Sequence, residues 1–195
     1  HGTIGFSYSY SVAVTNQKFS AESNQIIFSY PQSSLLSNTL TPAHQPIVSS
    51  TGNEMYFIND KSYFGQTPTL TAVSTQTNTV IRSFDFHLTT PYYTLALSKD
   101  DSKLYTVFED SLMVFDAANF NVLMTAHLDF YGRKIVCGRT DRLYVVPYAP
   151  ASVNGQIKIL DAGSGDEIGY PGIDARMEMV YISSDNNTLY GVGKP

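Results

Sequence analysis

The chain has 195 residues, a formal net charge of -5 and a single cysteine. Charged residues make up 15% of it, below the roughly 25% of typical soluble domains. Without a run of Lys or Arg it cannot neutralise a phosphate backbone, so we exclude nucleic acid as a partner. One cysteine rules out an intrachain disulfide and any zinc site built on cysteine pairs, and no stretch approaches the ~20 apolar residues of a membrane span.

A short pattern with a central tyrosine returns four times, and each copy follows a polar turn. The first copy reads Glu54-Met55-Tyr56-Phe57, and the second reads Lys103-Leu104-Tyr105-Thr106. The four tyrosines, Tyr56, Tyr105, Tyr144 and Tyr190, lie 49, 39 and 46 residues apart. A period of roughly 40 to 45 residues built from short strands is typical of propeller blades.

Each repeat predicts four short strands rich in β-branched and aromatic residues. The tyrosine pattern is the second strand of each unit. The first strands are 46–49, 94–97, 134–137 and 179–182; the third are 70–73, 112–116 and 157–161; the fourth are 80–84, 122–126 and 167–170. The connections are too short for parallel crossovers and favour antiparallel meanders. We therefore predict an all-β fold, a β-propeller or part of one, built of four-stranded antiparallel blades.

The repeats predict a single propeller domain or propeller segment of about four to five units. These units are approximately 11–45, 46–87, 91–130, 134–170, and 177–195 completed by 1–10. Propellers avoid an open edge by letting strands from one terminus complete the blade at the other. Two forms stay open: a five-bladed ring closed by residues 2–10, or part of a longer propeller of six to eight blades.

The stretches Pro91 to Asp116 and Gln156 to Glu167 resemble the YVTN-type β-propeller repeat, and the resemblance extends over about residues 46–195. That repeat combines a Pro-led first strand, a polar turn, a Leu-Tyr strand and a third strand ending in Asp. Its members are mostly seven-bladed, which favours the longer propeller. The usual turn glycine is replaced in three of four units, and the absence of tryptophan argues against WD40 and quinoprotein blades.

Aromatic residues gather in the loops that join units and in those between second and third strands, which share one face of a propeller. Flat rings bury area at small entropic cost, so they suit a protein or glycan partner. The alternative is that these rings pack locally at the ends of the blades. The candidate binding residues are Tyr63, Phe64, Tyr92, Tyr93, Tyr131, Tyr148 and Tyr170.

The sequence offers only weak candidates for catalysis. Asp85 and His87 lie two residues apart after a predicted fourth strand, so both side chains would share a side if that strand stays extended, and they could form an oriented base. Arg133 and Arg176 could line the same face. The four histidines have no metal-ligand spacing, and we expect neither a metal site nor a cofactor.

These observations favour a non-catalytic binding or structural module, extracellular or at the cell surface, that presents aromatic loops to a protein or glycan. Self-assembly through open blade edges is a further option. The alternative is a hydrolase resembling the propeller lactonases and acting on a sugar lactone, and a third hypothesis is a subunit that supports an electron-transfer partner. Asn186 lies in the one glycosylation sequon found, at a predicted turn.

Overall fold

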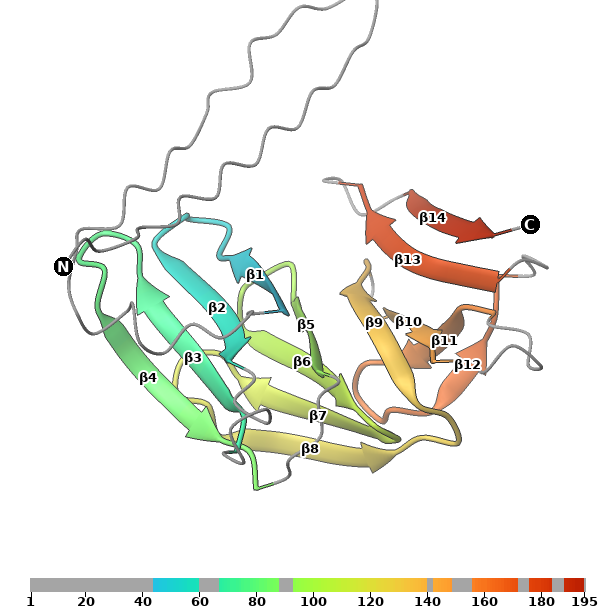
Figure 1. The fold of residues 1–195 in the computed structure, drawn as a ribbon, viewed down its shortest axis with the longest axis horizontal. Helices are drawn as coiled ribbons and strands as arrows, with labels where there is room; N and C mark the ends of the chain where they lie inside the picture. The colour runs from blue at the N-terminus through green and yellow to red at the C-terminus, as the bar shows by residue number, and fades with distance from the viewer. Residues whose placement is uncertain are drawn as a thin grey trace, which may run out of the picture. The chain divides into compact units, whose positions relative to one another are not determined.

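The computed structural model describes residues 44–59, 67–87, 93–139, 142–148, 156–171, 176–183 and 188–194, all within the unit Thr39–Pro195. Over this part of the chain the backbone forms strands β1 to β14 and no helix (Figure 1). It therefore contains no helix with the length and apolarity that a membrane crossing requires. Residues 1–43, with the unit predicted from residue 11 and the closing strand predicted at 2–10, lie outside the described residues.

Along the described part of the chain, three four-stranded sheets and one two-stranded sheet follow one another. The first holds β1 (His44–Val48), β2 (Glu54–Asn59), β3 (Thr69–Ser74) and β4 (Val80–Asp85). The second holds β5 (Tyr93–Leu97), β6 (Lys103–Phe108), β7 (Ser111–Asp116) and β8 (Val122–His127). The third holds β9 (Gly132–Cys137), β10 (Arg142–Pro147), β11 (Lys158–Asp161) and β12 (Glu167–Gly169), and the last holds β13 (Arg176–Ile182) and β14 (Leu189–Lys194).

Within each sheet the strands pair in chain order, and every pair is antiparallel. This confirms the predicted all-β fold of antiparallel four-stranded blades. The strand positions predicted from the repeat lie within or beside the observed strands, and the first strands β1, β9 and β13 begin two or three residues earlier than predicted.

The turn between the third and fourth strands is the same in all three four-stranded sheets. The N–H of Asn78, Phe120 and Gly165 donates to the carbonyl four residues earlier, at 2.8 Å in each case. All three residues have left-handed backbone, with φ of 55°, 62° and 81°. Asn and Gly tolerate this conformation and Phe does so rarely, so the residue at the left-handed position favours the turn in the first and third sheets and does not in the second.

The polar turn between first and second strands also repeats, and it rests on a serine. The hydroxyl of Ser49, Ser98 or Ser183 accepts the N–H five residues later, at 3.1, 2.9 and 2.9 Å. In the second sheet the Asp100 carboxylate accepts hydrogen bonds from Ser98 and Ser102, and these bonds lower the pKa of Asp100 to about 2. Side-chain oxygens that bond nearby backbone are the local chemistry that favours turns over strands.

Consecutive sheets pack against each other, and their first strands lie side by side: β5 lies beside β1 and β9, and β9 lies beside β13 (Figure 1). The two faces of the central strands therefore belong to different apolar clusters. In β6, Leu104 and Phe108 pack with the first sheet, whereas Tyr105 and Val107 pack with the third. The outermost strands β4 and β8 alternate between exposed and half-buried residues because only one of their faces is covered.

Polar contacts add to the junction between the first and second sheets. The Arg82 guanidinium forms an ion pair with Glu54 and donates from Nε to the carbonyl of Ala117 at 2.9 Å. The same guanidinium lies 5.3 Å from the centre of the Phe120 ring and 5.9 Å from that of Tyr56, within cation–π range. Burial, together with the hydrogen bond to Glu54, raises the pKa of Tyr56 to about 12. Arg82 thus connects two strands of its own sheet to a turn of the next.

Candidate binding surface

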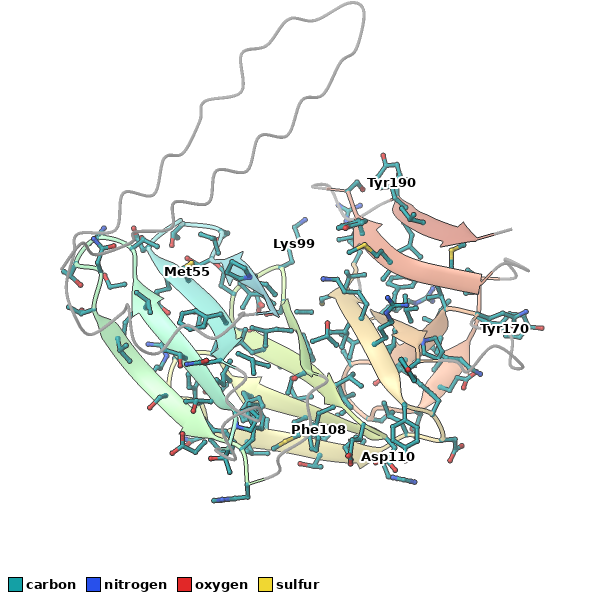
Figure 2. The ribbon with its side chains drawn as sticks, viewed as in Figure 1. Met55, Lys99, Phe108, Asp110, Tyr170 and Tyr190 are labelled. Carbon is teal, nitrogen blue, oxygen red and sulfur yellow. The ribbon has the colours of Figure 1, made fainter. Side chains whose placement is uncertain are left out.

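One end of the second and third sheets is held together by main-chain hydrogen bonds between three loops. The two-residue turn Glu109-Asp110 joins β6 to β7, and Glu109 adopts a left-handed φ of 49°. Its carbonyl accepts from the N–H of Gly132 at 2.8 Å, and the carbonyl of Asp110 accepts from Leu128 at 2.5 Å. The connection between β8 and β9 is thereby fixed against this turn. Figure 2 shows Phe108 and Asp110 at this end of the second sheet and Lys99 at the opposite end.

Tyr131 and Tyr148 are brought together at this end. Tyr131 precedes β9 and Tyr148 follows β10, and these strands pair so that Gly132 lies opposite Pro147. The N–H of Tyr148 donates to the carbonyl of Tyr131 at 2.6 Å, and both residues are exposed. Two of the predicted binding tyrosines are therefore neighbours in space, although they lie 17 residues apart in the sequence. The hydrogen bond between their main chains holds them together.

Charged groups of both signs flank this tyrosine pair. Arg133 is exposed on β9, two residues beyond Tyr131, and Asp129 is exposed on the connection that precedes it. The Asp110 carboxylate lies 3.8 Å from Nδ1 of the exposed His127, at the end of β8. A partner at this end would thus meet two phenols together with carboxylate, imidazole and guanidinium groups.

The remaining predicted binding residues do not join this pair. Tyr170 is exposed where the chain leaves β12, the outermost strand of the third sheet (Figure 2). Tyr93 opens β5, and its side chain is not among those described. Tyr63, Phe64 and Tyr92 lie outside the described residues.

The four weak catalytic candidates are spread over three sheets. Asp85 ends β4, the outermost strand of the first sheet, and His87 lies two residues beyond this strand; Arg133 lies on β9 and Arg176 on β13. Both Asp85 and His87 are exposed, and Phe86 between them is buried in the core. The Asp85 carboxylate accepts from the hydroxyl of Thr69 at 3.0 Å. Among the described residues, no ion pair or hydrogen bond joins Asp85 to His87.

No group of three or more His, Cys, Asp or Glu among the described residues is arranged to hold a metal ion. Cys137 is half-buried against the cluster between the second and third sheets. Sequence reasoning did not identify the Glu109-Asp110 turn as the element that fixes the surface. Its signal is the two-residue spacing between β6 and β7, which only a tight hairpin can span.

Comparison with known proteins identifies the fold and no more. No protein-family model matches the chain, and no curated protein matches its sequence. Among solved structures, hydrazine synthase of Kuenenia stuttgartiensis is similar over 84% of this chain and 45% of its own, with TM-score 0.59 and 20% identity. The β-propeller domain of Cps50 (Swd1) from Myceliophteria thermophila is similar over 79% of this chain and 51% of its own, with TM-score 0.58 and 9% identity.

The chain thus spans about half the length of each of these two structures. At these identities the likeness concerns the fold alone and carries no activity or partner across. Together with the antiparallel four-stranded sheets, it shows that the described residues adopt the fold of a β-propeller, whole or in part.

Proposed function

We propose that this chain is a non-catalytic binding module that holds a protein partner at the loop end of its second and third sheets. The observation that carries the proposal is the exposed pair Tyr131 and Tyr148, whose main chains are joined by a hydrogen bond. Tyrosine is enriched at binding hot spots because its ring buries a large area and loses little side-chain entropy. A main chain that is already ordered lowers the entropic cost of binding further.

The surroundings of the pair favour a protein over a glycan. Asp129 and Arg133 supply charges of opposite sign around an aromatic centre, which is the arrangement of a polar rim around a hot spot. The low charged content and the abundance of Ser, Thr and Tyr support a position outside the cell or at its surface. Membership of the YVTN-type repeat family rests on the Leu-Tyr strands and the Asp-ended third strands, and it is part of this proposal.

The competing hypotheses have less support. The lactonase hypothesis needs Asp85 and His87 to act together, yet Asp85 accepts from Thr69 and lies on an outermost strand. No observation on the described residues favours the electron-transfer subunit.

The experiment uses a photo-crosslinking residue at position 131 in the protein expressed in its source organism, followed by affinity measurements with the captured protein. We expect the double variant Tyr131→Ala/Tyr148→Ala to weaken binding about 30-fold or more, since hot-spot residues contribute about 2 kcal/mol or more. Tyr170 is equally exposed just after the outer strand β12, so Tyr170→Ala is the matched control and should bind like the wild type.

Equal binding by the double variant and the control would contradict the proposal. So would capture of glycans alone on a carbohydrate array, or hydrolysis of a sugar lactone by the wild type that His87→Ala abolishes.

A further inference from the structure

The repeated tyrosine occupies the same register in all four sheets, and the four positions can be compared directly. Each tyrosine lies opposite a residue of the first strand: Ile47 with Tyr56, Ala96 with Tyr105, Val136 with Tyr144, and Tyr181 with Tyr190. The next residue on the same face of the second strand is Ile58, Val107, Val146 or Val192. The repeated tyrosine, the first-strand residue opposite it and the next residue on the same side of the second strand define what we call the forward face of each sheet.

In the first three sheets the forward face is covered by the sheet that follows in the chain. Tyr56 and Ile58 pack with Leu95 and Leu104 of the second sheet. Tyr105 and Val107 pack with Ile135, Leu143 and Val145 of the third.

The third junction is built in the same way. Tyr144 and Val146 pack with Met177, Val180 and Leu189 of the last sheet. What covers a forward face is thus the same each time: an antiparallel strand pair that presents aliphatic side chains, with a leucine at the start of its second strand.

The forward face of the last sheet has the same chemistry and no cover among the described residues. Tyr190 is 57% exposed where Tyr105 is 1% exposed, and Val192 is 54% exposed where Val107 is fully buried. Met179 and Tyr181 are exposed beside them, and the Tyr181 hydroxyl bonds to the Met179 sulfur at 3.4 Å, which places both on this face. Four large apolar side chains on one sheet face form a patch of the kind that marks an interaction site.

We infer that the forward face of the β13–β14 sheet packs against a further blade of the same polypeptide, formed by residues outside 44–194. The three junctions of this chain specify the occupant, an antiparallel sheet presenting Leu, Ile and Val. The matched length supports the same polypeptide as the source of this blade, because the chain covers only 45% of the hydrazine synthase chain and 51% of the Cps50 propeller domain. A second copy is the weaker candidate: Phe57 and Val73, on the face of the first sheet that it would have to offer, are already buried.

The test places a photo-crosslinking residue at position 190 in the full polypeptide from its source, produced as a mixture of isotopically light and heavy protein. We expect crosslinks within one copy, to a strand outside residues 44–194 that carries alternating aliphatic residues. In the wild type, Tyr190 should be iodinated about ten-fold or more slowly than Tyr170, because a packed blade protects it from reagents. Position 170 is the matched control for both measurements.

Crosslinks between light and heavy copies would overturn the inference in favour of self-assembly. Iodination of Tyr190 as fast as that of Tyr170, with no crosslink from position 190, would show that the face is bare. Neither measurement depends on Tyr131 or Tyr148, so the inference and the proposed function can fail separately.

Discussion

The second and the last sheets contain the same strand pair in the same register, in opposite surroundings. Tyr105 and Tyr190 both follow a leucine, and both pair with the residue before the end of a first strand. One ring lies in the core and the other faces outward. Strand and register are therefore local properties of this motif, because they depend on the turn beside it and on residue alternation. Burial of the tyrosine is not local, since it requires the neighbouring sheet.

The comparison extends to the polar groups at the junctions. The first junction has Arg82 spanning two sheets, and Asp101 of the second sheet accepts hydrogen bonds from the Ser50 N–H at 2.8 Å and hydroxyl at 2.5 Å. The second junction has a buried bond from the N–H of Ile135 to the hydroxyl of Thr94 at 3.1 Å. Apolar packing is thus common to the junctions, whereas the polar contacts differ from one junction to the next.

The largest expected effect comes from truncating the tyrosine in its two settings. Tyr105→Ala should lower the free energy of unfolding by about 3–5 kcal/mol, because it removes a buried ring and leaves a cavity. Tyr190→Ala in the full polypeptide should cost at least about 2 kcal/mol if a further blade covers it. Chemical denaturation of both variants measures the loss in the free energy of unfolding. A loss of less than about 0.5 kcal/mol for Tyr190→Ala would mean that Tyr190 lies at an exposed surface site.

A smaller effect should follow from breaking the polar contacts of the first junction. Arg82→Met retains much of the apolar stem and removes the bonds to Glu54 and Ala117. Hydrogen bonds to charged groups contribute about 1.5–3 kcal/mol, so we expect a loss of about that size in denaturation experiments. Arg133→Met removes an equal charge from an exposed site and should change stability by less than about 0.5 kcal/mol. Equal effects of the two substitutions would show that the Arg82 contacts contribute nothing specific.

The smallest effect concerns the serine turns, which are alike in the buried and exposed settings. The pKa of Asp100 is lowered to about 2, chiefly by its bond from Ser98, from the usual value of 3.8. A lowered pKa stabilises the fold above about pH 4, and this contribution is lost as the pH falls towards 2. Asp100→Asn should therefore reduce the acid sensitivity of the denaturation midpoint between about pH 5 and 2. An unchanged pH profile would show that these bonds are too solvent-exposed to matter.

Much of the fold could be predicted from the sequence because its signals are local. The tyrosine period, the Asn and Gly that accept left-handed backbone, and the serine and aspartate turns all act within a few residues. At Phe120 the residue type gave no signal of left-handed backbone; there the ring packs 6.4 Å from that of Tyr56 and within cation–π range of Arg82. For the candidate surface, the sequence identified Tyr131 and Tyr148 singly but not as a pair.

The sequence by itself determined the strands, their order and their antiparallel register, since hairpins and side-chain alternation need only neighbouring residues. The tertiary structure alone decided which face of each strand is covered and which distant residues meet. Arg82 joins Glu54, 28 residues before it, to Ala117, 35 residues after it. Such contacts form only when whole sheets pack, and the packing depends on the combined apolar surface of two sheets. For the same physical reason the motif that buries Tyr105 leaves Tyr190 exposed in the last described sheet.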